Sequence, residues 1–253
     1  KEHILFPTCY SENHKIYKEE TRENILIQPP SLHFPAWLKD DETRTCDLRP
    51  VSHLLREGED KTLQPFKYLL FNSSVEARKN LLFLVKAYAE SNLGRKGVKL
   101  CVTGKLKKDS YSKSVREVVQ HEPGIVLTGY IDESTKLDLY LNAMGLLSPS
   151  LVEGFGIPAL DAACLGMPAI VSDCDSHNEI QKLHDYENYI ITVNTLETRE
   201  WATAMQSISG ISSSIAEKAV EERQARINRY SKESLQLKNS FKDDLIQLIN
   251  KSI

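Results

Sequence analysis

Short apolar runs recur along the chain from residue 67 onward, and longer amphipathic stretches separate them. The runs occupy residues 68–71, 98–102, 125–127, 145–147, 169–171 and 189–193. Each run is almost continuously apolar, which is typical of a strand that is buried on both faces of a sheet. Most of them end in small or turn-forming residues, such as Asn72, Gly104 and Gly129. The pattern therefore predicts six short buried strands.

The stretches between these runs carry apolar residues at helical spacing. The clearest examples are Leu81, Leu84, Val85 and Tyr88, then Val115, Val118 and Val119, and then Leu137, Tyr140 and Leu141. Alternation of strand and helix predicts an α/β fold with a Rossmann-like, doubly wound parallel sheet covered on both faces. Ligands of such folds lie beyond the carboxyl ends of the strands, so we expect the chemistry at that edge.

The two ends of the chain lack this alternation of apolar runs and amphipathic stretches. Residues 1–66 are broken by prolines such as Pro29 and Pro50, and we interpret them as a linker region with the remnant of an amino-terminal domain. At most one strand is expected there, at residues 25–27. Residues 211–253 are helical by pattern, with a break expected at residues 230–233. The predicted domains are thus 1–66, 67–210 and 211–253, the last being carboxy-terminal helices.

Composition and charge narrow the range of partners. The net charge of −3 gives no electrostatic reason to expect a nucleic acid. No apolar run approaches the ~20 residues of a membrane span, although a peripheral membrane contact stays open. The five cysteines are scattered without metal-ligand spacing, so no metal site and no disulfide framework are predicted. A cytoplasmic location, with or without contact at the inner membrane, is the expected setting.

The strongest candidate for a ligand-binding segment is residues 153–161, Glu-Gly-Phe-Gly-Ile-Pro-Ala-Leu-Asp, which follows a predicted buried strand. Gly154 and Gly156 permit unusual dihedrals and close approach of a ligand, while Pro158 suits the first turn of a helix. Free N–H groups at a helix start can hold an anion such as a diphosphate. Glu153 and Asp161 flank this turn, where they can accept hydrogen bonds from sugar hydroxyls. A plain helix-capping role for both acids remains an alternative.

Basic residues follow two other predicted strands. Arg78 and Lys79, followed by Asn80, are expected to begin a helix, where cations oppose the helix dipole and call for an anionic partner. Lys105 follows Thr103 and Gly104, so it projects from the same edge of the sheet. Two solvated surface charges are the competing interpretation of Arg78 and Lys79.

The histidines show no metal-ligand spacing with one another or with a cysteine. His177 lies near the rim of the expected cleft, and we interpret it as a surface-loop residue, with contact to a ligand as the alternative. Trp37 and Trp201 are interpreted as packing residues.

Taken together, these landmarks resemble glycosyltransferase family 4. The resemblance rests on Arg78-Lys79-Asn80, Gly129-Tyr130 and the segment from Pro149 to Pro158, and it extends through Gly166, Pro168, Ser172 and Asn178-Glu179. It covers residues 67–195 in order. The resemblance implies a GT-B architecture, in which this part of the chain is the carboxy-terminal nucleotide-sugar-binding half. It also implies a cytoplasmic hexosyltransferase of bacterial polysaccharide biosynthesis, with a glycan or lipid-linked acceptor.

The resemblance also implies roles for single residues. Glu153 would contact the donor sugar, and the amides of Gly154, Phe155 and Gly156 would lie beside the sugar and the phosphates. Asp161 takes the position of a ribose-binding glutamate, and Lys79, with Arg78 near it, takes that of a diphosphate clamp. Gly129, Tyr130 and Ile131 would line the base, with Lys105 nearby. Family members retain the anomeric configuration and need no metal or cofactor beyond the GDP- or UDP-linked donor.

Two departures from the family pattern bear on function. Asn72-Ser73 stands where the family often has Gly-Arg, which tilts the expected donor toward GDP-mannose over a UDP-sugar. Residues 1–66 are too few for the acceptor-binding amino-terminal domain, so we expect that domain to be missing and the fragment alone to transfer little or no sugar. A nucleotide-sugar epimerase and a non-catalytic nucleotide-sugar-binding module of the same fold remain alternatives. A glycoside hydrolase using Glu153 and Asp161 is disfavoured, because its carboxylates would have to lie ~5 Å apart.

Overall fold

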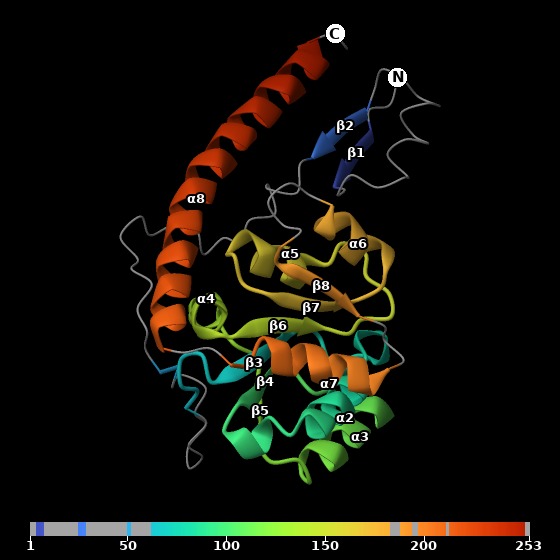
Figure 1. Cartoon of the computed structure of the whole chain (residues 1–253). Helices are drawn as coiled ribbons and strands as arrows, with labels where there is room; N and C mark the ends of the chain where they lie inside the picture. The colour runs from blue at the N-terminus through green and yellow to red at the C-terminus, as the bar shows by residue number, and fades with distance from the viewer. Residues whose placement is uncertain are drawn as a thin grey trace. The chain divides into compact units, whose positions relative to one another are not determined.

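A computed structural model describes residues 4–7, 25–28, 50–51, 62–182, 188–193, 197–210 and 213–250. The chain divides into two compact units, one made of residues 1–42 and 227–253 and the other of residues 43–226 (Figure 1). The second unit contains the large sheet and all of the predicted site residues.

The large sheet has six strands, and every pair of neighbours in it is parallel. The strands are β3 (Tyr68–Asn72), β4 (Lys99–Thr103), β5 (Ile125–Gly129), β6 (Gly145–Ser148), β7 (Ala169–Ser172) and β8 (Ile190–Val193). Their order is β5-β4-β3-β6-β7-β8. All six predicted strands are confirmed, and so is the doubly wound α/β class. The direction of winding reverses between β3 and β6, which is where folds of this kind form a crevice for a ligand.

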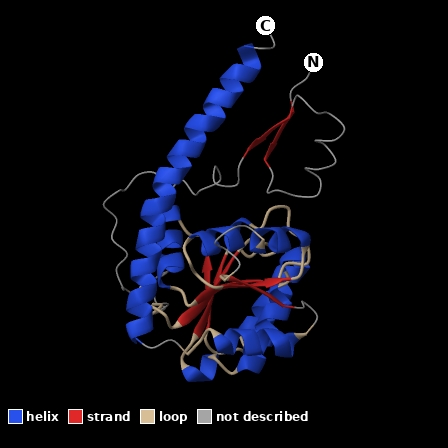
Figure 2. Cartoon of the chain, turned by 45° about the horizontal axis from the view of Figure 1, so that its top comes forward, coloured by secondary structure: helices blue, strands red, loops and turns tan. Residues whose placement is uncertain are grey.

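Helices cover both faces of the sheet (Figure 2). One face carries α2 (Leu81–Ser91), α3 (Ser110–Val119) and α7 (Thr198–Ser207), and the other carries α4 (Glu133–Asn142), α5 (Ile157–Cys164) and α6 (Asp175–Gln181). The 3-10 helix η4 (Gly94–Lys96) leads into β4. Successive residues of β3 alternate between the two faces, as they must in a strand. Phe71 joins the core under α2, whereas the Tyr68 hydroxyl donates to the carbonyl of Leu139 in α4 at 2.6 Å.

The core under α2 and α7 is closed by Trp201, which is fully buried and meets the ring of Phe83 edge to face at 6.0 Å. The predicted packing role of Trp201 is therefore confirmed, whereas Trp37 lies outside the described residues.

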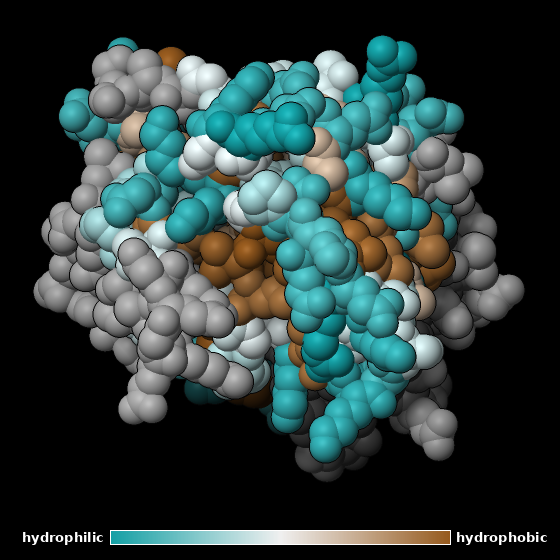
Figure 3. Space-filling model, turned by 90° about the horizontal axis from the view of Figure 1, so that it is seen from below, coloured by the Kyte–Doolittle hydropathy of each residue, from teal (hydrophilic) through white to brown (hydrophobic). Residues whose placement is uncertain are grey.

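Seen from below, where α2, α3 and β5 lie, hydrophilic side chains cover most of the surface, and apolar side chains form the floor of a hollow between them (Figure 3). Among the described helices, not one is long and apolar enough to cross a membrane.

The structure corrects two predictions about the chain ends. Residues 4–7 form β1 (Ile4–Pro7), which pairs in parallel with β2 (Ile25–Gln28), so the expectation of at most one strand was wrong. The helix α8 (Ser213–Asn250) runs for 38 residues through the expected break at 230–233. A serine such as Ser231 costs only a few tenths of a kcal/mol inside a helix, and the neighbouring Lys, Glu, Gln and Leu residues favour continuation.

The first turns of α8 are fixed to the sheet domain by a buried arginine. Arg223 is 2% exposed, and its guanidinium donates to the carbonyls of Tyr140 at 3.1 Å, of Ala143 at 3.0 Å and of Leu141. These carbonyls lie at the end of α4, where they have no partner within the helix and where the helix dipole favours a cation. The guanidinium also lies over the ring of Phe66, 4.9 Å from its centroid.

We predict that Arg223→Met lowers the free energy of unfolding by roughly 3 kcal/mol or more, because it leaves buried carbonyls without donors. Urea unfolding at neutral pH measures this loss. Lys218→Met is the matched control, since Lys218 is exposed on the same helix, and it should change the free energy by no more than about 0.5 kcal/mol. Equal effects of the two substitutions would contradict an anchoring role for Arg223.

Candidate functional site

The basic pair after β3 lies in a short 3-10 helix, η3 (Ala77–Lys79), rather than in the first turn of α2. Asn80 separates the two helices with a left-handed backbone (φ 56°), a conformation that asparagine tolerates better than most residues. Arg78 and Lys79 thus lie in the last turn of a short helix, and the prediction that they begin a helix was wrong. Their geometry is set by this sharp turn, which buries Lys79 to 6% exposure and leaves Arg78 half exposed.

The turn after β6 places a glycine at the start of α5. Gly156 has φ 74° and is the N-cap, and Pro158 follows in the first turn of the helix, as predicted. Gly156 has no side chain and forms no side-chain capping hydrogen bond, so the first N–H groups of α5 can bind a ligand. A Cβ on Gly156 would lie 3.0 Å from Ile180 and 3.1 Å from His177, so this turn packs tightly onto α6.

Lys79 and Glu153 meet directly at the point where the sheet reverses its winding. The Lys79 ammonium and one carboxylate oxygen of Glu153, Oε1, form a close ion pair, and both side chains are only 7% exposed. Ser150 donates a second hydrogen bond to the same oxygen at 2.7 Å. The backbone carbonyl of Glu153 accepts from the Ser176 hydroxyl at 2.9 Å. The carboxylate is thus fixed from one side before any ligand binds.

The other oxygen of Glu153, Oε2, lies on the side of the half-exposed Arg78. It lies 3.8 Å from the Arg78 guanidinium, which is an ion-pair distance but too long for a hydrogen bond. Arg78 also binds Glu76 at 3.1 Å, and Glu76 in turn binds Lys107 at 3.0 Å. These pairs bring together three cations and two carboxylates, a net charge of +1 that suits an anionic ligand.

Asp161 lies inside α5 and is 5% exposed. Its Oδ2 atom has no hydrogen-bond partner among the described residues, which is costly for a buried carboxylate. Burial raises the pKa of this carboxyl to about 7, while the nearby ammonium of Lys136 lowers it and Glu133 raises it. A helix-capping role does not apply to Asp161, because it lies beyond the first turn of α5 and the start of that helix has no side-chain capping bond.

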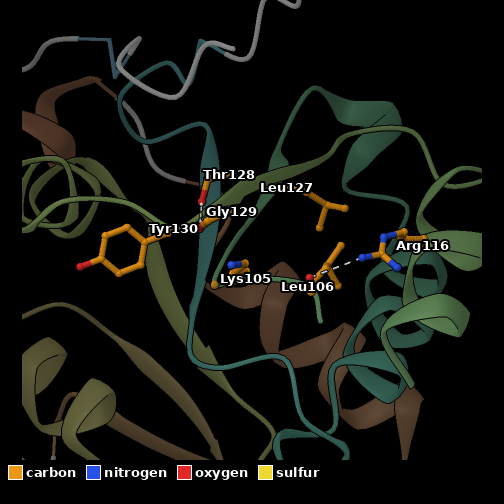
Figure 4. A pocket seen from close by; sticks show the side chains of 8 residues that line it. Lys105, Leu106, Arg116, Leu127, Thr128, Gly129 and Tyr130 are labelled. Carbon is orange, nitrogen blue, oxygen red and sulfur yellow. Dashed lines mark hydrogen bonds between the residues drawn. The ribbon is translucent and has the colours of Figure 1, made fainter. Parts of the chain in front are cut away.

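A pocket of about 430 Å³ opens where β4 and β5 end (Figure 4). It is lined by Gly104, Lys105, Leu106, Arg116, Leu127, Thr128, Gly129 and Tyr130. Arg116 closes one end by donating to the carbonyls of Leu106 and Lys107 at 3.4 and 3.1 Å. Tyr130 is 83% exposed and points away from the apolar floor in the close view. The pocket therefore combines an apolar floor with basic and hydroxyl groups at its rim.

His177 is fully buried in α6, so its interpretation as a surface-loop residue was wrong. Its ring nitrogens contact groups on two neighbouring strands, with Nε2 3.2 Å from the Ser148 hydroxyl and Nδ1 3.0 Å from the Ser172 carbonyl. Cys174 lies 3.2 Å from Nδ1. Burial raises the pKa of the Cys174 thiol, but its hydrogen bonds to His177 and Ser172 outweigh that effect, and the net shift is downward.

The predicted site residues fall into two neighbouring groups. Arg78, Lys79 and Glu153 form one cluster, with Gly154, Phe155, Gly156 and Asp161 following directly along the chain, whereas Lys105, Gly129 and Tyr130 line the pocket at β4 and β5. Sequence reasoning missed Glu76, and it assigned no contact to Ser150 or Asn72. Asn72 joins β4 to α4 by accepting from Thr103 at 2.7 Å and donating to Tyr140 at 2.9 Å. Within the described ranges, no group of three acidic, histidine or cysteine side chains could hold a metal ion.

Comparison with known families gives a match to the family described as "Glycosyl transferases group 1" over residues 66–209. An uncharacterized glycosyltransferase of Methanocaldococcus jannaschii is 29% identical over 116 residues, which are 46% of this chain and 30% of that protein. The O-antigen chain mannosyltransferase RfbU of Salmonella typhimurium is 33% identical over 78 residues, 31% of this chain and 21% of that protein. O-antigen chain mannosyltransferase B of Escherichia coli is 30% identical over 115 residues, 45% of this chain and 30% of that protein.

Solved structures agree with the fold. Sucrose-phosphate synthase from Thermosynechococcus elongatus superposes with a TM-score of 0.62 at 19% identity, covering 96% of this chain and 58% of that one. The pneumococcal O-GlcNAc transferase GtfA, in complex with UDP and GlcNAc, superposes with a TM-score of 0.59 at 18% identity. The match covers 97% of this chain and 45% of that one. These likenesses confirm the expected half of a GT-B fold. The matches to curated proteins span less than a third of each relative's length. The matches to the two solved structures span about half of each of those chains.

Proposed function

Because the chain belongs to the glycosyl transferase group 1 family, we propose that residues 67–210 bind the nucleotide-sugar donor of a retaining glycosyl transfer. The observation that carries the proposal is the Glu153 carboxylate, which Lys79 and Ser150 hold by one oxygen at the carboxyl end of the sheet. A carboxylate has about four lone-pair sites, and those of Oε2 remain available to accept a further hydrogen bond. A sugar hydroxyl is such a donor.

The diphosphate of the donor would lie between the turn at residues 154–156 and the Arg78 side chain. The start of α5 offers backbone N–H groups and the positive end of a helix dipole. Arg78 is half exposed and bound to Glu76, so it can exchange that exposed partner for a phosphate. Gly154 has open space around it among the described residues, so the protein itself leaves room there for a ligand.

The base would occupy the pocket at the ends of β4 and β5. Leu106 and Leu127 supply an apolar surface for its ring face, and Thr128 and Lys105 supply polar groups at its edge. Glu76 links the two subsites, because it binds both Arg78 and Lys107, and Lys107 follows directly on the pocket loop. The unpartnered Oδ2 of Asp161 supports its assignment to the ribose hydroxyls.

Among donors, we propose GDP-mannose ahead of a UDP-sugar. Two of the curated relatives are O-antigen chain mannosyltransferases, which also suggests a glycan or lipid-linked acceptor. No metal or further cofactor is part of the proposal, because cationic side chains and a helix start can balance the phosphate charge.

Isothermal calorimetry tests the proposal with GDP, UDP and ADP and with GDP-mannose, UDP-glucose and ADP-glucose. We expect one nucleotide to bind, and its sugar conjugate to bind more tightly. Failure of all six to bind would refute the donor site. Retention is checked separately, by the anomeric configuration of the product of a transfer reaction, and an epimerised free donor would favour the epimerase instead.

Glu153→Gln should reduce the affinity for the sugar conjugate about tenfold more than the affinity for the bare nucleotide, because a charge-assisted bond to a sugar hydroxyl is lost. The matched control is Glu200→Gln, since Glu200 is exposed on α7, and both affinities should then stay unchanged. Equal losses for conjugate and nucleotide in the Glu153 variant would mean that its carboxylate does not contact the sugar.

A further inference from the structure

His177 is a buried polar residue at the base of the donor site, and the proposed reaction gives it no direct task. It is 0% exposed, so it does not reach a ligand in the cleft. Its ring nevertheless contacts the ends of β6 and β7 and the turn that begins α5. A buried histidine with polar partners on several elements is well placed to fix their relative geometry.

The hydrogen-bonding partners determine the tautomer of His177. The Ser172 carbonyl, 3.0 Å from Nδ1, can only accept a hydrogen bond, so Nδ1 carries the proton. In this tautomer Nε2 accepts, and the Ser148 hydroxyl donates to it at 3.2 Å. The ring therefore joins β6 and β7 with a defined direction of hydrogen bonding.

A chain of hydrogen bonds leads from this ring to the Glu153 carboxylate. The Ser172 hydroxyl lies 3.2 Å from Nδ1 and itself donates to the carbonyl of Ser150. The Ser150 hydroxyl then donates to Glu153 at 2.7 Å. A second link runs through the next residue on α6, because Ser176 donates to the backbone carbonyl of Glu153 at 2.9 Å.

The ring also supports the turn by direct packing. A Cβ on Gly156 would lie 3.1 Å from the His177 ring and 3.0 Å from Ile180, so both side chains press against the glycine that begins α5. Ile180 shares this packing role but has no polar group to share in the hydrogen-bond chain.

We propose that His177 is a positioning residue, which holds the Glu153 carboxylate in its sugar-binding orientation through Ser172 and Ser150. This inference rests on the proposed function of Glu153. It predicts that loss of the His177 nitrogens lowers the affinity gained from the sugar, while the affinity for the bare nucleotide changes little.

The test uses three substitutions. His177→Phe keeps an aromatic ring against Gly156 and removes both nitrogens, Ser172→Ala removes only the middle hydroxyl of the chain, and His177→Asn restores one donor near Nδ1. We expect the first two to reduce the ratio of nucleotide to nucleotide-sugar Kd about tenfold, and His177→Asn to recover part of it. Ile180→Val is the control for packing alone and should leave the ratio unchanged.

Crystal structures of the His177→Phe and Ser172→Ala variants give a readout that needs no ligand. We expect the Glu153 carboxylate to have left Ser150 in both, and an unchanged Ser150–Glu153 bond in both would overturn the proposal. An equal fall of the Kd ratio in Ile180→Val would overturn it too, because packing would then suffice. If the unsubstituted chain gains no affinity from the sugar, the donor proposal fails, and these structures still decide whether His177 positions Glu153.

Discussion

Lys79→Met is expected to lower the free energy of unfolding by roughly 3–5 kcal/mol, because it leaves the Glu153 carboxylate buried without its cation. Both side chains of the pair are only 7% exposed. Ser150 and the more distant Arg78 stay beside the carboxylate, and neither replaces a buried ammonium. Urea unfolding of the variant at neutral pH measures the loss.

A double-mutant cycle separates the ion pair from other effects of the substitution. Glu153→Gln in the Lys79→Met background should recover most of the lost stability, because no unpaired charge then remains in the site. The coupling free energy between the two positions should be about 2–4 kcal/mol. Additive effects would show that Lys79 and Glu153 do not interact in solution.

An exposed ion pair in the same chain serves as a control for the buried pair of Lys79 and Glu153. Lys113 and Glu117 approach to 3.9 Å on α3, but their side chains are 77% and 61% exposed. Lys113→Met should therefore change the free energy of unfolding by less than about 1 kcal/mol. A loss as large as that of Lys79→Met would point to a general effect of the substitution.

The ion pair also shows where inference from sequence reaches its limit. The strands β3 to β8 could be predicted, because burial on both faces leaves a short apolar run that few other elements produce. Lys79 and Glu153 were each singled out by their place after a strand. Their contact could not be predicted, since it depends on the conformations of two loops that are 74 residues apart in the chain.

His177 was misjudged for a related reason. It follows Ser172 and Cys174 in a run of small and acidic residues that is typical of a surface loop. The run instead folds into α6, and it buries the imidazole against hydroxyls from β6 and β7. One usable signal was present: Ser148 and Ser172 end two strands that pair in parallel, so polar groups gather at one position on the sheet edge.

Asp161 gives the second large effect, which depends on pH. Burial raises the pKa of its carboxyl from 3.8 to about 7, so the folded chain keeps a proton that the unfolded chain releases above pH 4. Stability from this group is therefore fully present below pH 3.8, falls as the pH rises toward 7, and is lost above that. A shift of about 3 units corresponds to roughly 4 kcal/mol across this window.

Asp161→Asn should remove this dependence, because an amide has nearly the same shape and does not ionise. At pH 8 the variant should be more stable than the parent by up to roughly 4 kcal/mol, and at pH 4 the two should be nearly equal, as measured by urea unfolding at each pH. Asp243→Asn is the matched control, since Asp243 is exposed on α8, and it should leave the pH profile unchanged. Parallel profiles for the Asp161 variant and the parent would refute the raised pKa.

The same substitution separates stability from binding. If Asp161 accepts a hydrogen bond from a ribose hydroxyl, its ionised form is the stronger acceptor, and nucleotide affinity should rise between pH 6 and 8. Asp161→Asn should flatten that rise and weaken nucleotide binding at pH 8 while it stabilises the fold. Such opposite effects are expected at a binding site, where a buried and unpartnered carboxylate is retained at the expense of stability. A variant that is more stable and binds the nucleotide equally well would show that Asp161 does not contact the ribose.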